Sequence, residues 1–244
     1  MYLGKDSICY KYLYEMKSEN GWDNLIELTR VLNKEPQHLE KILNVDQTLW
    51  MLAFNNVLIY KSDLQGTADS LSYSPSDSML YFYNKPVLWS EENQMSADSV
   101  WIQLSGGSID KLFMVMNAFV IAEDTLKNFN QIKGRKMVAQ FKDDNIHHVD
   151  VQGNGESLYF ALEEAEIEEA QVRVLATVGM NKIICSNMKI NFLAGKLNNI
   201  SFYVNPDASF IPPHELKKDD LKLKGFNWRG KERPTRDNVV SNKN

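Results

Sequence analysis

Apolar and polar residues alternate in three copies of one unit, at residues 100–114, 137–151 and 188–202. Each copy has an alternating segment, a four-residue turn and a second alternating segment, and a period of two is typical of β-strands. Equivalent positions are 37 residues apart in the first two copies and 51 apart in the last two, as positions 100, 137 and 188 show. Such repetition predicts stacked hairpins, none of which can bury its apolar face alone.

One face of these predicted strands is apolar and the other is polar. The polar face carries Gln103, Gln140, Lys189 and Asn191, which is typical of an antiparallel sheet that is packed on one side and wet on the other. Stacking predicts a curved sheet or flattened barrel, whose apolar interior is filled by its own side chains or accepts an apolar ligand. The predicted inner face comprises Val100, Leu104, Leu112, Met114, Met137, Phe141, Val149, Val151, Met188, Phe192, Ile200 and Phe202.

A looser copy of the unit precedes these three. Residues 68–71 read Ala-Asp-Ser-Leu, and the similar Ala-Asp-Ser-Val follows at 97–100. Residues 74–77 have the Ser, Pro and Asp composition that favours a turn between two strands. Asn117 and Asn154 occupy equivalent places in two copies, and this equivalence favours a structural corner at both positions over a binding role.

Residues 1–57 have the helical period of 3.6 instead of two. We expect three short amphipathic helices, the first capped by Asp23, the second beginning at Pro36 and the third capped by Asp46. Their apolar positions are Leu25, Ile26, Leu28 and Leu32, then Leu39, Ile42 and Leu43, then Leu49, Trp50, Leu52, Ala53 and Val57. The period changes at 58–60 without a Gly/Pro linker, which indicates a junction between two parts that fold independently.

The alternation stops after Val204, where a polar stretch with several prolines begins. A last apolar group follows and could close one end of the stack; it comprises Leu221, Leu223, Phe226 and Trp228. The sequence therefore predicts a β domain over 59–228 and a disordered tail over 229–244.

Composition narrows the functional classes. The 244 residues carry a net charge of −5, which gives no support for a nucleic-acid footprint. Cys9 and Cys185 make neither a disulfide framework nor a zinc motif, so free thiols are expected. No apolar run has the length of a membrane span. The first residues have no basic segment followed by an apolar one, so no signal peptide is predicted.

No motif of a known catalytic site is present. The chain lacks a glycine-rich phosphate loop, G-x-S-x-G, H-E-x-x-H and C-x-x-C. His147 and His148 are adjacent, so on a regular strand their rings would point to opposite faces and could not share a metal ion. The acidic stretch at 163–169 is expected to be a solvated loop or one helical turn. The sequence thus predicts no catalytic residue, no metal site and no cofactor.

Six short motifs between residues 59 and 228 resemble the OstA-like proteins of Bacteroidetes, relatives of the lipopolysaccharide-transport protein LptA. They are DLQGTADSL at 63–71, KPVLW at 85–89, GRKM at 134–137, VDVQGN at 149–154, GMNK at 179–182 and LKGFNW at 223–228. The resemblance implies a β-jellyroll, or folded β-taco, whose apolar groove shields lipid acyl chains and which has no catalytic residues. It further implies a periplasmic location, lipopolysaccharide or another lipid as partner, and edge-strand pairing with other β-jellyroll proteins of this transport type.

Residues 1–57 resemble a different family, the C-terminal region of CotH-family kinases. The resembling runs are WDNLIEL at 22–28 and NVDQTLWMLAFNNV at 44–57. The phosphate-binding and metal-binding parts of that family are absent, so a fusion, a truncated start and an assembly artefact all stay open for the junction. Two alternatives to lipid transport follow: a kinase fragment with an accessory β domain, and a lipid-free structural repeat scaffold.

Overall fold

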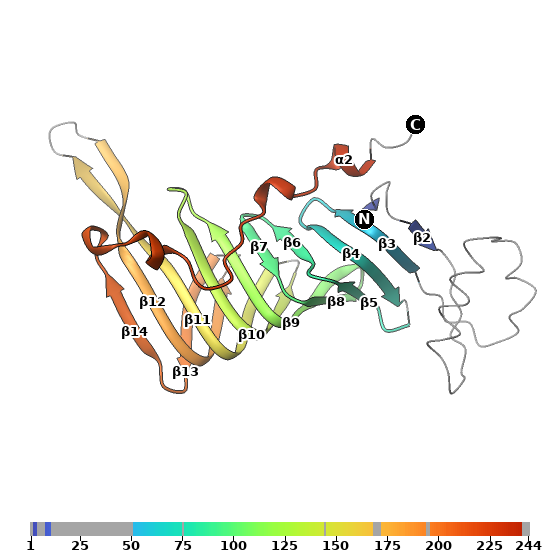
Figure 1. Cartoon of the computed structure of the whole chain (residues 1–244), viewed down its shortest axis with the longest axis horizontal. Coiled ribbons are helices and arrows are strands. Elements are labelled where there is room, and N and C mark those ends of the chain that lie inside the picture. Colours follow the sequence, from blue (N-terminus) through green and yellow to red (C-terminus); the bar gives the residue numbers. More distant parts are fainter. Residues whose placement is uncertain are drawn as a thin grey trace, which may run out of the picture.

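The described part of the chain is mainly antiparallel β-sheet (Figure 1). The computed structural model describes residues 2–3, 8–10, 51–74, 76–143, 145–167, 172–193 and 196–240. The strands are β1 (Tyr2–Leu3), β2 (Ile8–Tyr10), β3 (Met51–Tyr60), β4 (Gln65–Ser74), β5 (Met79–Tyr83), β6 (Val87–Ser90), β7 (Asn93–Ser96), β8 (Ser99–Ser105), β9 (Ser108–Glu123), β10 (Phe129–Lys142), β11 (Asn145–Ile167), β12 (Val172–Leu193), β13 (Lys196–Tyr203) and β14 (Asp207–Ile211). Three 3₁₀ turns, η2 (Pro213–Glu215), η3 (Lys218–Leu221) and η4 (Gly230–Glu232), and the short helix α2 (Arg236–Val240) follow.

The three predicted repeat copies are confirmed as antiparallel hairpins. They are β8–β9, β10–β11 and β12–β13. The looser copy forms the hairpin β4–β5. Each hairpin is only part of a longer arrangement, because β9, β10, β11 and β12 extend well beyond the residues that alternate in the repeat.

Six strands close into a ring of two layers. β4 pairs with β6 through residues 65–67 and with β5 through residues 70–74. β9 likewise pairs with β8 through its first half and with β7 through its second half. Because β5 pairs with β8 and β6 pairs with β7, the circuit is complete. Layer one holds β5 and β8 with the adjoining halves of β4 and β9, and layer two holds β6 and β7 with the other halves.

The sheet continues beyond the ring on both layers. β10, β11 and β12 follow β9 in order, and each contributes to both layers. β13 then pairs with residues 187–193 of β12 in layer one, and β14 pairs with residues 180–184 of β12 in layer two. The main hydrophobic core lies between the layers and runs from Ala53 of β3 to Ile190 of β12.

The chain crosses from layer one to layer two through pairs of residues in the left-handed backbone region. These pairs are Asn55–Asn56, Asn84–Lys85, Met116–Asn117, Gly153–Asn154 and Val204–Asn205, with φ between 51° and 74°. Asn and Gly tolerate this region better than other residues. The predicted structural corners at Asn117 and Asn154 are therefore confirmed, and they belong to a series that runs along the whole sheet.

The repeated Ala-Asp-Ser motif forms the return crossing from layer two to layer one. The Asn84 side-chain amide donates to the Asp69 carboxylate at 2.8 Å, and the Asn117 amide donates to the Asp98 carboxylate at 2.9 Å. In both cases the aspartate of a return crossing is thus bound by the asparagine of the next corner along the sheet. The two Ala-Asp-Ser motifs are 29 residues apart because they belong to two successive Asp–Asn pairs along the sheet.

Residues 212–240, here called the C-terminal strap, cross the outer face of layer two (Figure 1). Gln94 donates to the Asn227 carbonyl at 2.7 Å and accepts from the Arg229 N–H at 2.6 Å. Gln94 is almost fully buried under the strap, so its amide pairs with strap backbone in place of water.

The glutamines under the strap share one cross-strand row. Gln131 donates to the Leu221 carbonyl and accepts from the Leu223 N–H, both at 2.8 Å. Cα partners connect Gln65 through Trp89 to Gln94, and Gln94 through β9 to Gln131. At the far end of the row, the Arg233 guanidinium donates to the Gln65 side-chain oxygen at 2.7 Å. The strap therefore follows one register row across the strands.

Three sequence predictions fail in the described residues. The predicted third helix is wrong over 51–57, because Met51–Tyr60 is strand β3 and runs straight through the predicted junction at 58–60. The other two predicted helices, over 23–43, lie outside the described residues. The predicted disordered tail is wrong over 229–240, where Arg229 and Arg233 bind layer two and Val239 is buried. The acidic stretch extends strand β11 as far as Ile167.

We predict that Asn117→Ala lowers the free energy of unfolding by about 1–2 kcal/mol. Alanine in the left-handed region costs about this much, and the bond to Asp98 is also lost. Asn117→Gly is the matched control, because glycine loses the same bond without the backbone penalty. Urea unfolding of both variants measures the difference. Equal losses would show that the left-handed backbone at this corner contributes nothing.

We predict that Gln131→Leu loosens the C-terminal strap. The change leaves the Leu221 carbonyl and the Leu223 N–H without partners, and an unpaired buried group costs about 1–3 kcal/mol. Limited proteolysis should cut the strap sooner than in the wild type, and urea unfolding should show the lower stability. Gln103→Leu, on the outer face of layer one, is the control. Unchanged cleavage in Gln131→Leu would contradict the role of this row.

Candidate functional site

The predicted inner-face residues all lie between the two layers. Seven of them are members of the buried core: Val100, Leu112, Met114, Met137, Val149, Val151 and Met188. The remaining five are partly buried and pack against that core: Leu104, Phe141, Phe192, Ile200 and Phe202. The polar residues expected on the other face, Gln103, Gln140, Lys189 and Asn191, are partly exposed. These positions identify the interior, whereas binding of a lipid by them stays a prediction.

The interior of the six-strand ring is filled by its own side chains. Phe82, Val100, Ile102 and Leu112 have no exposed surface, and Met114 is 1% exposed. These residues come from β5, β8 and β9 of layer one and pack toward layer two. Close packing of this kind leaves no room for a guest molecule.

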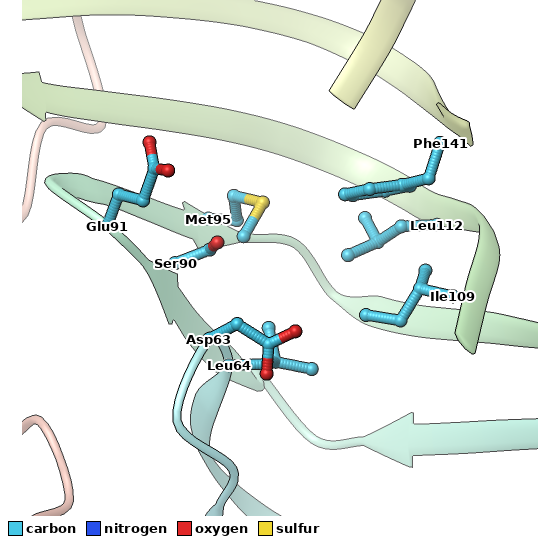
Figure 2. Close-up of a pocket in the computed structure, with 8 residues that line it drawn as sticks. All are labelled: Asp63, Leu64, Ser90, Glu91, Met95, Ile109, Leu112 and Phe141. Carbon is cyan, nitrogen blue, oxygen red and sulfur yellow. The ribbon is translucent and has the colours of Figure 1, made fainter. Parts of the chain in front are cut away.

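A small cavity of about 70 Å³ remains where the ring meets β10. Figure 2 shows its lining residues: Leu112, Ile109 and Phe141 on the layer-one side, and Asp63, Leu64, Ser90, Glu91 and Met95 on the other. A cavity of about 150 Å³ holds benzene, so this one is too small for a lipid chain. The Asp63 and Glu91 carboxylates lie at its rim, and a long apolar chain would need the space beyond Phe141.

The interior beyond the ring, between β10 and β14, is the open end. Here the layer-one residues Phe141, Phe192, Ile200 and Phe202 are only partly buried. Facing them, Tyr159 of β11 is 42% exposed and lies between Leu158 and Phe160, which pack outward under the strap. Alternation along the strand therefore directs Tyr159 inward.

Phe210 of β14 completes the open end. It is a Cα partner of Asn181, and Asn181 is the partner of the inward Tyr159. Its ring covers Gly179, where a Cβ atom would lie only 2.1 Å from the Phe210 ring. Although it faces inward, Phe210 is 55% exposed. Aromatic side chains thus line an interior surface that the protein itself leaves uncovered.

Tyr159 and Phe210 are inner-face residues that the repeat pattern does not predict. Phe210 follows Val204, where the regular alternation ends, and β14 has only five residues. Ala208 and Phe210 give one alternation step, which is too short to identify a strand. For Tyr159, the parity read from Val149 and Val151 is kept across the two-residue Gly153–Asn154 corner, so extending the alternation past residue 151 would have identified its inward face.

The outer face of layer one carries the histidine pair, and its geometry corrects the prediction. His147 Nδ1 lies 2.8 Å from His148 Nδ1, so the two rings meet and do not point to opposite faces. A register shift between Gln140 and Phe141 places an extra residue here, and this bulge rotates the neighbouring side chain. His148 Nε2 also lies 3.3 Å from the Asp150 carboxylate.

Burial lowers the pKa of His148 below its ordinary value, and Lys189 lowers it further. Asp150 opposes both effects without cancelling them. Neutral His148 is therefore the form that fits the folded protein. His147 adds to the lowering, which agrees with the contact between the two rings.

Metal and thiol chemistry have little support in the described residues. Within them, no three His, Cys, Asp or Glu side chains gather closely enough to hold a metal ion. Cys185 is a free, buried thiol on the inner face beside Gly155, and burial raises its pKa. A thiol with a raised pKa stays protonated and is a poor nucleophile.

Among the residues that the structure describes, no helix has the length and apolar character to cross a membrane.

We predict that His148 makes the stability fall as the pH is lowered. The unfolded histidine titrates near about 6.5, whereas the folded one has a lower pKa. Below the unfolded pKa the unfolded state binds more protons, so stability is lost until the pH passes the folded pKa. Urea unfolding of wild type and His148→Gln at about pH 8 and about pH 5 measures this. Parallel losses in both proteins would contradict the prediction.

Two kinds of interior thus follow one another along the sheet. The ring is packed solid, and the open end exposes inward-facing aromatic and aliphatic side chains on both layers. The described side chains that line the open end are mainly aromatic and aliphatic, a lining that is typical of sites for apolar molecules. Neither a protein-family model nor a curated protein matches this chain.

Proposed function

We propose that the protein is a non-enzymatic lipid-carrying module of the lipopolysaccharide-transport type, with the fold of an open β-jellyroll or β-taco. The observation that carries the proposal is the open end, where Tyr159 and Phe210 face inward and stay exposed. The resemblance of residues 59–228 to OstA-like proteins supplies the chemical class. The ligand is lipopolysaccharide or another lipid, and the place of action is the periplasm.

The physical basis of the proposal is the apolar surface left in contact with water. Covering apolar surface contributes about 25 cal/mol per Å², or about 0.8 kcal/mol for each buried methylene group. An acyl chain lying between Phe192 and Phe202 of layer one and Phe210 of layer two would cover such surface on both layers. The rigid, filled ring would hold the layers apart at one side of this space.

The second candidate function is a lipid-free structural scaffold, and the filled ring favours it. If side chains also close the open end in solution, the chain needs no ligand. Native mass spectrometry of the purified protein separates the two candidates, because a carrier should retain lipid from the cells that made it.

The kinase-fragment alternative rests on residues 1–57, of which 11–50 lie outside the described residues. Titration of the protein with ATP and Mg²⁺ tests this alternative.

We predict that a photo-crosslinking phenylalanine analogue at position 192 forms a covalent adduct with lipopolysaccharide. Phe192 packs against the core on the inner face. The matched control is the same analogue at Asn191, the next residue on the strand, whose side chain pairs with Asn199 on the outer face. Both proteins would be irradiated in cells that export lipopolysaccharide, and adducts detected by immunoblotting. The proposal would be wrong if position 192 gave no lipid adduct, or no more than position 191.

A further inference from the structure

The two ends of the sheet differ in how their edges are covered. At the β3 end, β2 pairs with residues 52–54 of β3 and β1 pairs with residues 59–60. The helix α2 lies against both β1 and β3 (Figure 1). At the other end, β13 and β14 each pair only with β12 among the described strands. The β3 edge is therefore capped within the chain, whereas the β13–β14 edge offers unpaired backbone groups.

Apolar side chains accompany the uncapped edge. Ile184 of β12, the Cα partner of Asp207, is 48% exposed, and Val204 between β13 and β14 is 59% exposed. Phe210 on β14 itself is also largely exposed. An edge with unpaired N–H and C=O groups and exposed apolar side chains is suited to pairing with another β-strand.

We propose that two copies of this chain join edge to edge through β14, about a twofold axis at Ser209. Antiparallel pairing about this point places Asp207 opposite Ile211 and Ala208 opposite Phe210 of the second copy. No like charges meet directly, and the two apolar residues on the inner face become neighbours. The same axis brings the β13 edges of the two copies together in layer one.

The capping of the β3 end favours a twofold contact between two β14 edges over a head-to-tail contact between a β14 edge and a β3 edge. A head-to-tail contact needs a free β3 edge, and β1 and β2 already pair with five of the ten residues of that strand, at both of its ends. A twofold contact uses the same edge on both molecules, so it closes at two copies. The pairing does not depend on the lipid role. It would, however, join the two open ends into one longer interior and cover Phe210.

The test introduces charged side chains of either sign at Ser209, on the twofold axis. Ser209→Lys places two lysines opposite each other near Lys182, the Cα partner of Ser209, and Ser209→Glu places two glutamates there. Like charges facing each other in an interface are strongly unfavourable, so each variant should dimerise at least about tenfold more weakly. An equimolar mixture should restore dimers, because lysine then faces glutamate. Analytical ultracentrifugation of the full chain gives the dissociation constants.

Controls separate this contact from general effects on folding. Ser105→Lys, at the exposed end of β8 far along the sheet, should leave the dimer unchanged. Circular dichroism should show the same fold in all variants. A monomeric wild type, including one that binds only a different β-protein through this edge, would overturn the proposal. So would oligomers larger than two, or a mixture that fails to restore the dimer.

Discussion

The left-handed corners are the constraint on which the rest of the structure depends. A strand that leaves layer one must turn sharply to enter layer two, and each such crossing uses two residues with positive φ. Two of the asparagines at these places, Asn84 and Asn117, also bind the aspartates of the neighbouring return crossings. The corners therefore line up along one side of the sheet, and this alignment keeps the two layers facing each other over the apolar core.

The ring and the open end follow from how many strands complete the circuit between the layers. β6 and β7 join the layer-two halves of β4 and β9, so the interior between them is enclosed and packs solid. No such bridge exists among the described strands beyond β9, because β13 and β14 pair with β12 alone. The interior beyond the ring has the same apolar character but lacks the closing strands, so several of its described side chains stay partly exposed.

The C-terminal strap stabilises layer two from outside. Its Leu223 buries against Phe119, Leu158 and neighbouring residues, so layer two has apolar contacts on both faces. The glutamine row supplies hydrogen bonds that a purely apolar outer face could not give to a crossing backbone. Since the strap reaches from the β14 end to α2 beside β1, it also connects the uncapped edge to the capped one.

The sequence by itself determined the elements whose signals are local. Alternation identified the repeat hairpins and the inner face, and equivalent asparagines identified two corners. In β3 the signal was misleading, because Ala53 and Val57 both face the core but are four residues apart, a helical spacing. This spacing also fits a strand, but the exposed corner at Asn55–Asn56 stands between the two residues and interrupts the apolar alternation that would have identified one.

Only the tertiary structure decided the features that need a partner distant in the sequence. The strap is polar and proline-rich when taken alone, and its order comes from Gln94 and Gln131, more than 90 residues away. The meeting of His147 and His148 comes from a bulge opposite β10, and the inward face of Phe210 comes from its pairing with β12. Alternation shows which residues share a face; strand pairing alone decides where the enclosed interior ends and the open one begins.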